Sequence, residues 1–447
     1  MVDAIYFVVI VLNATGIFRF AALPLHVSIG EISAVLFALN LFYLAIKARR
    51  TAPLLLRGDF GAWLFVLLAW PLLTLLYSPT INAREIGLLA YDATLFFGVA
   101  VYALSNGLPS LRRAFSASLL ITIAGMALSL IAPGHFAAVA DLANARTDYM
   151  GRPFGFFLQP NSLAVSIGFL FIAWYALRQR KGALFDVAAI GGFLLLELVT
   201  GSRSGILVAG VTGALILGHS WRSRLFSGRL LVTIGVLAIC VGGAAAALNL
   251  YLSRVGSTTV RREVDLIDRM QAMLSLKLNP QGGVEDDISV QKRMETQAVY
   301  WDLVMQKPLL GHGFGADSHY QETGVIRLSA HSDALTRAME QGLLCPIVFV
   351  WMLLRLYWRR GRRDLEDFFE TNATAQFVFI TIPLFAGSSI FDERTFFVVL
   401  GVFVVVALCP AYLFQRDDAT GKITGHWDRR CDRKAVRQPE EADSVSV

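Results

Sequence analysis

Charged residues are scarce in this chain of 447 residues: Asp, Glu, Lys and Arg make up 17% of it, whereas 55% of its residues are hydrophobic. The apolar residues stand in long blocks. A helix of about 20 apolar residues crosses the roughly 30 Å of hydrocarbon in a bilayer. The shortage of charge therefore argues against a soluble domain, and the long blocks predict an all-α polytopic membrane protein.

Cysteine is also scarce, with four residues in the chain. Cys240, Cys345 and Cys409 lie in apolar runs, and Cys431 lies in a charged tail. None falls in a candidate outer loop, so we expect no disulfide framework. The first residues lack a basic stretch and a small-residue cleavage site, so we interpret them as a first span and not as a cleaved signal.

Two common ligand signatures are missing. The stretch KPLLGHGFG has no strand before it and no GKS or GKT after it, so we predict no nucleotide site and interpret Gly311, Gly313 and Gly315 as a tight turn on the outer surface. The one dense acidic cluster of the long loop is Glu285–Asp287, in a glycine-rich stretch. We therefore predict neither a metal nor another cofactor.

The hydropathy pattern predicts about twelve transmembrane helices. They cover residues 4–23, 27–46, 60–78, 86–105, 114–133, 160–177, 183–200, 204–218, 230–251, 338–354, 373–390 and 395–413. The resulting regions are spans 1–9 in residues 1–251, a long loop with amphipathic helices in 252–337, spans 10–12 in 338–413, and a charged, disordered tail in 414–447.

The distribution of basic residues gives the orientation. More than half of the 40 Lys and Arg residues lie in alternate short loops and in the tail. Short loops rich in Lys and Arg stay in the cytoplasm, whereas long loops translocate largely regardless of charge. We predict that both termini are cytoplasmic and that residues 252–337 are outside. The net charge of +6 is then a topology signal and no argument for a nucleic-acid partner.

An arginine interrupts two apolar runs in ELVTGSRSGILVAG, residues 197–210. Placing Arg203 close to hydrocarbon costs about 2.5–3.5 kcal/mol on insertion scales, so its presence calls for a function. Another outer stretch, GRPFGFFLQPNSLA, contains Arg152 and Asn161; Pro160 and Asn161 are also ordinary helix-start residues. The ionisable residues near outer span ends predict a polar cavity open to the outside, or else interfacial anchors: Glu31, Asp92, Glu197 and Arg394.

The long loop contains the amphipathic stretch SVQKRMETQAVYWDLVMQ. Its apolar face comprises Val290, Met294, Ala298, Trp301 and Met305. Arg293, Gln297 and Tyr300 form a second stripe beside it. We expect a helix that lies with its apolar face on the bundle and directs Arg293 toward the cavity; the alternative is a solvated Arg293.

The stretch SAHSDALTRAMEQG leads into span 10. Ser332 is a good helix N-cap, and Asp333, Arg337 and Glu340 are spaced to share one face of the helix that follows. His331 precedes them at the mouth of the membrane and has either a structural or a functional role. Neighbours in sequence do not face one another on a helix, so a protease triad is poorly supported.

In their order, spacing and sidedness these motifs resemble the O-antigen ligase superfamily. The resemblance rests on TGSRSG in a helix hairpin, a long outer loop with an arginine-bearing helix and KPLLGHGFG, and H-S-x-x-L…E-x-G at the next span. Gln159 and Ser332 stand where members often have His and Asn. The superfamily includes O-antigen ligases, O-antigen and exopolysaccharide polymerases, and protein O-oligosaccharyltransferases.

The resemblance implies a lipid-sugar glycosyltransferase fold in the bacterial inner membrane, with its active site facing the periplasm. An O-antigen ligase transfers glycan from undecaprenyl diphosphate to the lipid A–core. The resemblance puts functional weight on Arg203, Arg293 and His331, and we place Arg152, Asn161, Glu340 and Asp333 in supporting roles. A polymerase or protein-glycosylating relative is the alternative enzyme, and a lipid-glycan transporter is the alternative outside enzymes.

The residue types suit this chemistry. Arginine presents a fork of donors that matches phosphate oxygens and stays charged, so Arg203 and Arg293 fit a departing diphosphate. His331 has the right kind of side chain to take the proton of an acceptor hydroxyl. No carboxylate pair suggests a covalent glycosyl-enzyme. We therefore expect a metal-independent, inverting displacement.

Overall fold

The computed structural model describes part of the chain. The described residues are 1–20, 27–56, 59–132, 134, 136, 153–157, 159–177, 183–202, 205–206, 208–213, 216, 288–326, 330, 332–358, 394–408, 415–416 and 423–424. Predictions that fall on other residues, among them spans 9 and 11 and most of the tail, lie outside the described residues.

Almost all described elements are helices. They are α1 (Val2–Thr15), α3 (Ile29–Leu56), α4 (Asp59–Leu64), the π-helical turn η1 (Phe65–Ala69), α5 (Trp70–Thr74), the 3-10 turn η2 (Leu75–Tyr77), α6 (Ala83–Ile131), α8 (Pro160–Ala176), α9 (Ala183–Thr200), α13 (Ile288–Gln306), α14 (Ala316–Glu322), α15 (Asp333–Gln341), α16 (Leu344–Trp358) and α18 (Arg394–Leu408). In the tail, β1 (Gln415–Arg416) and β2 (Ile423–Thr424) pair antiparallel.

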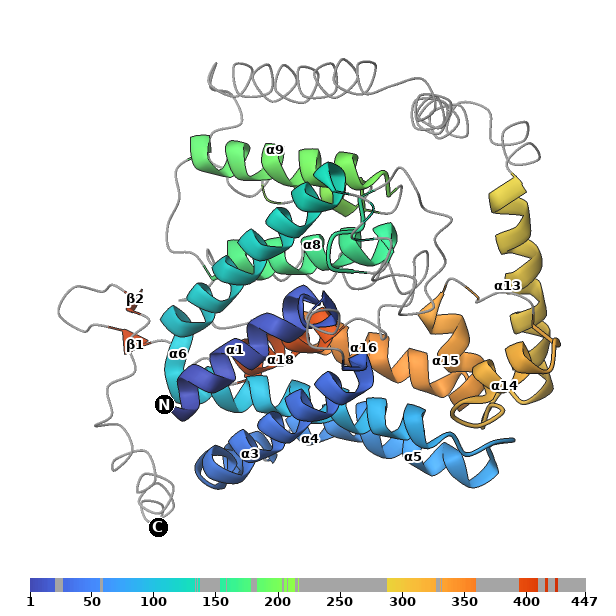
Figure 1. The fold of residues 1–447 in the computed structure, drawn as a ribbon. Coiled ribbons are helices and arrows are strands. Elements are labelled where there is room, and N and C mark those ends of the chain that lie inside the picture. The colour runs from blue at the N-terminus through green and yellow to red at the C-terminus, as the bar shows by residue number, and fades with distance from the viewer. Residues whose placement is uncertain are drawn as a thin grey trace, which may run out of the picture.

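Helix α18 lies at the centre of the bundle, packed against α6, α1 and α8 (Figure 1). Close approach of α18 to α6 depends on Gly401, where a Cβ would stand 2.7 Å from the Phe96 carbonyl oxygen. Small residues at such contacts let helix backbones approach closely in membranes. Helices α13, α14 and α15 lie together at the end of the bundle opposite the N-terminus (Figure 1).

Arg394 fixes one end of α18. Its guanidinium lies 4.2 Å from the Tyr91 ring centroid and donates to Ser33 Oγ at 3.1 Å and to Asn13 Oδ1 at 3.5 Å. The side chain therefore ties α18 to α6, α3 and α1. Glu31, which like Arg394 was predicted to line an outer cavity or to anchor the interface, forms a capping box with Ser28 at the start of α3.

Three described helices are long and apolar enough to cross a membrane: Ile29–Arg49, Phe60–Tyr77 and Ala83–Ile131. Four shorter apolar helices are Val2–Thr15, Pro160–Ala176, Leu344–Arg355 and Arg394–Val406. The segment Ala83–Ile131 contains a non-helical break at Gly107, with φ 69°, between the fourth and fifth predicted spans. The arrangement is that of an all-α membrane protein, while the count of twelve spans stays a prediction.

The predicted start of span 10, residue 338, does not coincide with the start of a described helix. Residue 338 lies within α15, which ends at Gln341, and the apolar helix α16 begins at Leu344. The break falls at Gly342, with φ 81°, where a Cβ would stand 2.1 Å from the Leu309 carbonyl oxygen. The apolar helix of this region therefore begins after α15, and Glu340 lies outside it; the boundary between loop and spans stays a prediction. Helix α9, Ala183–Thr200, has the bounds predicted for span 7, and its passage through a membrane stays a prediction.

Candidate functional site

Helix α15 begins as the sequence predicts. Ser332 is its N-cap, with Oγ accepting from the Leu335 N–H at 3.4 Å. One face carries Asp333, Arg337 and Gln341, three residues spaced four apart that line the same pocket. Gln341 was missed by the sequence interpretation, although its spacing from Arg337 is a usable signal. Glu340 is at the edge of this face and forms an ion pair with Arg337 at 3.5 Å.

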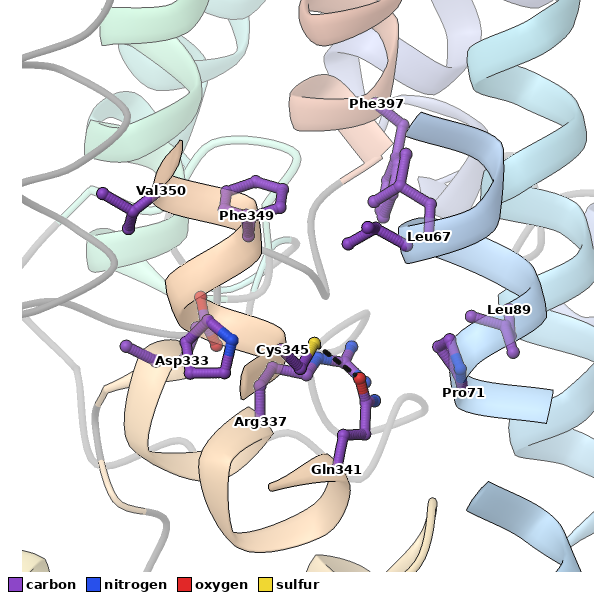
Figure 2. A pocket seen from close by; sticks show the side chains of 13 residues that line it. Leu67, Pro71, Leu89, Asp333, Arg337, Gln341, Cys345, Phe349, Val350 and Phe397 are labelled. Carbon is purple, nitrogen blue, oxygen red and sulfur yellow. Dashed lines mark hydrogen bonds between the residues drawn. The ribbon is translucent and has the colours of Figure 1, made fainter. Parts of the chain in front are cut away.

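The pocket lies between α15 and α16 on one side and η1 and α5 on the other, and its walls are mostly apolar (Figure 2). Its cavity volume is about 40 Å³, and the cavity is partly open to solvent. Its lining residues are Val66, Leu67, Pro71, Leu89, Asp333, Ala334, Arg337, Gln341, Cys345, Pro346, Phe349, Val350 and Phe397. The polar groups come from α15, while η1, α5, α16 and α18 supply apolar side chains. The pocket therefore has apolar walls on most sides and polar side chains at the end formed by α15.

The glycine-rich turn, residues 311–315, packs against α15. The His312 and Gly313 N–H groups donate to the Met339 and Glu340 carbonyl oxygens, both at 2.8 Å. These bonds satisfy carbonyls at the end of α15 that have no partner within the helix. At Gly311, with φ 72°, a Cβ would stand 2.5 Å from the Glu340 carbonyl oxygen. The predicted tight turn is confirmed, but residues 311–316 are buried, so the predicted surface position is wrong.

His312 holds this turn between two further helices. Its Nε2 lies 2.8 Å from the Leu303 carbonyl oxygen of α13, and its Nδ1 lies 2.8 Å from the Tyr320 hydroxyl of α14. Because a carbonyl only accepts, the pattern assigns the proton to Nε2 and leaves Nδ1 to accept from Tyr320. The ring is buried and both of its nitrogens are bonded. Its role is to hold α13, α14 and the turn together.

Glu340 is the buried carboxylate of the site. Its Oε1 accepts from the Gly315 N–H at 3.0 Å and the Asp317 N–H at 3.4 Å, and its Oε2 faces Arg337. Burial raises the pKa of Glu340 to about 7, against the lowering effect of Arg337. The carboxyl therefore links α15 to the start of α14 and titrates near neutral pH.

We expect this titration to appear in stability. A raised folded-state pKa means that the native protein holds the Glu340 proton more tightly than the unfolded chain does. The contribution of this proton to the free energy of unfolding is fully present below about pH 4.5 and is lost as pH rises through about 7. For a shift of this size the loss is on the order of 3 kcal/mol. Glu340→Gln removes the titration. The melting temperature of wild type minus that of Glu340→Gln should therefore decrease as the pH rises from 5 to 8.

The control for this prediction is Glu322→Gln, which changes an exposed glutamate of α14. Thermal melting in detergent at each pH measures both variants. If the melting temperature of Glu340→Gln depends on pH in the same way as that of wild type and Glu322→Gln, the prediction that Glu340 titrates near pH 7 is wrong.

Helix α13 packs by the face that we did not expect. Tyr300 and Val304 are buried against α14 and α15, whereas Trp301 and Met305 of the predicted apolar face are exposed. The packed face includes the second stripe: Gln297 Nε2 donates to the Ala330 carbonyl oxygen at 3.4 Å, and the Tyr300 hydroxyl donates to Asp317. The expectation that the apolar face of α13 lies on the bundle is therefore wrong. Helix α13 packs by the stripe of Gln297 and Tyr300 because these side chains form hydrogen bonds with Ala330 and Asp317.

The hairpin that contains TGSRSG has a compact start. Helix α9 ends at Thr200, Gly201 has φ 63°, and Ser202 Oγ accepts from the Gly205 N–H at 3.3 Å. Gly205 packs against Glu197: a Cβ there would stand 2.2 Å from Glu197 Oε2. Glu197 is fully buried, and neither of its carboxylate oxygens has a hydrogen-bond partner among the described residues.

The structure describes some of the predicted site residues and not others. His331, Arg203 and Arg152 lie outside the described residues, and for Arg293 only its backbone position in α13 is described. Asn161 lies in the first turn of α8, directly after Pro160, and so away from a helix-capping position, which Gln159 takes. Asp333 and Glu340 both lie on α15, at the pocket and at the glycine-rich turn.

Within the described ranges, no group of three or more His, Cys, Asp or Glu side chains is arranged to hold a metal ion. The acidic cluster Glu285–Asp287 lies outside them. Metal independence stays a prediction.

Comparison with known families gives one match. Residues 188–350 match the family model described as O-antigen ligase. The matched region includes most of α9 and all of α13, the glycine-rich turn and α15, and thus the hairpin and the buried carboxyl of Glu340. No curated protein matches the chain. The predicted resemblance to the O-antigen ligase superfamily is confirmed.

Proposed function

Because residues 188–350 contain the O-antigen ligase family domain, we propose that this membrane protein transfers O-antigen polysaccharide from undecaprenyl diphosphate to the lipid A–core on the periplasmic face of the inner membrane. The observation that carries the proposal is the pocket between α15 and α16 on one side and η1 and α5 on the other. Its apolar walls end at Asp333 and Arg337, two and six residues after His331. A polyprenyl chain needs such apolar walls, and its diphosphate needs a cation at their polar end.

Two neighbouring elements support the same assignment. Gln297 of α13 contacts the carbonyl of Ala330, the residue before His331. Arg293 stands one helical turn before Gln297, so helix geometry puts both positions on the face of α13 that meets this segment. Arg203 follows the Ser202 cap of the hairpin. The proposal assigns both arginines to the diphosphate.

The proposed reaction is a single displacement. The acceptor hydroxyl oxygen attacks the anomeric carbon of the donor sugar while the bond from that carbon to the diphosphate oxygen breaks. His331 takes the hydroxyl proton, and the arginines stabilise the charge that the diphosphate gains. Attack opposite the leaving group inverts the anomeric configuration. Asp333, Glu340, Arg152 and Asn161 have supporting roles.

Transfer by the purified protein tests this function. In nanodiscs that contain lipid-linked glycan and lipid A–core, we expect glycosylated core to form and the rate to survive EDTA, because the arginines neutralise the diphosphate. A rate that falls in EDTA and returns with Mg²⁺ or Mn²⁺ would contradict metal independence. Movement of lipid-linked glycan across vesicles without any transfer would favour the transporter.

A deletion strain separates the ligase from its enzymatic relatives. Loss of a ligase should leave polymerised lipid-linked glycan and a core without O-antigen. Loss of a polymerase should leave a core that carries a single repeat unit. Unchanged core glycosylation together with a missing glycan on a protein would favour the protein O-oligosaccharyltransferase.

A further inference from the structure

A strip of exposed apolar side chains borders the site at the junction of the long loop and the bundle. We call it the leucine rim: Leu76, Tyr77, Leu309, Leu310 and Leu344. The Leu309 and Leu310 side chains are 77% and 65% exposed, and Leu76 is 85% exposed. A soluble surface seldom presents neighbouring leucines this openly, so such a patch calls for a partner.

The backbone holds the two leucines in this position. The Tyr77 hydroxyl donates to the Leu310 carbonyl oxygen at 2.6 Å. The Leu343 N–H donates to the Pro308 carbonyl oxygen at 2.8 Å, and the absence of a side chain at Gly342 lets the Leu309 carbonyl approach α16. The turn is therefore fixed by its main chain to the ends of η2 and α16, and its side chains remain outside the core.

The rim continues the exposed apolar surface of α16 and of the segment Phe60–Tyr77, which is long and apolar enough to cross a membrane. Ile347 on α16 is exposed beyond Leu344, and Leu73 on α5 is exposed before Leu76. Lys307 is exposed just before the two leucines. A lysine beside exposed leucines is typical of a segment at the membrane interface, because its long apolar stem can lie along the leucines while its ammonium group reaches the headgroups.

We propose that the leucine rim inserts into the acyl-chain region of the leaflet that borders α13–α15, and that it anchors the glycine-rich turn and α15 at the membrane surface. The partner is lipid, because the rim is continuous with the exposed apolar surfaces of helices long or apolar enough for a membrane, and is not a separate patch. The anchor holds the mouth of the pocket beside α15 at the depth where the head of a membrane lipid lies. It requires only that the helices cross a membrane, so it stands or falls independently of glycan transfer.

Depth-dependent quenching tests the anchor. Leu309→Cys and Leu310→Cys, in a background with the four native cysteines replaced by serine, are labelled with an environment-sensitive dye in nanodiscs of phosphatidylethanolamine and phosphatidylglycerol. We expect a nitroxide on the lipid acyl chain to quench both positions several-fold more than a label at Glu322→Cys on α14. Iodide in the water should show the reverse order. Equal iodide quenching at 309 and 322, without quenching by the nitroxide lipid, would overturn the proposal.

A second experiment keeps the native cysteines. A photo-crosslinking benzoylphenylalanine replaces Leu309 in the otherwise native chain, and mass spectrometry identifies the adducts formed in the same nanodiscs. Lipid adducts at position 309, absent when the probe replaces Glu322, support the anchor. Crosslinks from position 309 to a second copy of the chain, or no lipid adduct at all, would overturn it.

Discussion

Replacing Arg203 or Arg293 by alanine is expected to lower glycan transfer by about 10²–10³-fold, the usual cost of removing one preorganised donor to a developing negative charge. The diphosphate gains charge as the glycosidic bond breaks, so the loss should lie mainly in kcat. Lysine at either position should restore activity only in part, because an ammonium group supplies a point charge and no bidentate fork. Transfer with purified variants in nanodiscs measures both effects.

Arg355→Ala is the matched control, since Arg355 lies in the last turn of α16 and contacts the Trp351 ring at 5.1 Å. It should keep near-normal transfer. Thermal melting of all variants separates a catalytic loss from a folding defect. Near-normal transfer by a well-folded Arg203→Ala protein would show that this arginine is an interfacial anchor, and the diphosphate role would then be wrong.

Helix existence and helix ends were predictable wherever their causes are local. Helix α9 matches its predicted span, and α8 begins at the predicted Pro160, because apolar length and a proline in the first turn act within a few residues. The Ser332 cap of α15 was predictable for the same reason. The TGSRSG stretch also ends one helix and caps the next turn through its own residues.

The errors have tertiary causes. The break between α15 and α16 depends on Gly342, which is needed because the Leu309 carbonyl occupies the space of a side chain there. The face of α13 was misjudged because two stripes were available, and contacts with Ala330 and Asp317 selected the one with Gln297 and Tyr300. Periodicity shows that a helix has two faces; it does not show which face its partners fit.

The candidate site was predictable at α15 and not around it. The spacing of Asp333 and Arg337 indicated a shared face, and both residues line the pocket. The opposite wall comes from Val66, Leu67 and Phe397, which are distant in sequence and carry no motif. His312 was overlooked because a histidine between glycines looks like part of a turn. Its two ring bonds form only when α13 and α14 come together.

Replacing His331 by alanine is expected to lower the transfer rate by about 10²–10⁴-fold, the range for loss of a general base, while donor binding is retained. An ordinary histidine has a pKa near 6.5, and its protonated ring accepts no proton, so wild-type activity should fall as pH drops below that value. Glu340 also titrates near neutral pH, because burial raises its pKa to about 7. The wild-type pH profile alone therefore does not identify the base.

The variant Glu340→Gln resolves the two titrations. If His331 is the base, the acidic limb of the rate profile should persist in Glu340→Gln, and the stability change across the same pH range should disappear. NMR of the product anomeric centre supplies the independent readout, with inversion expected from one displacement by the acceptor hydroxyl. Net retention would rule out that displacement. If the acidic limb is lost in Glu340→Gln, the pH dependence of the rate comes from Glu340, the buried carboxyl that joins α15 to α14, and not from His331.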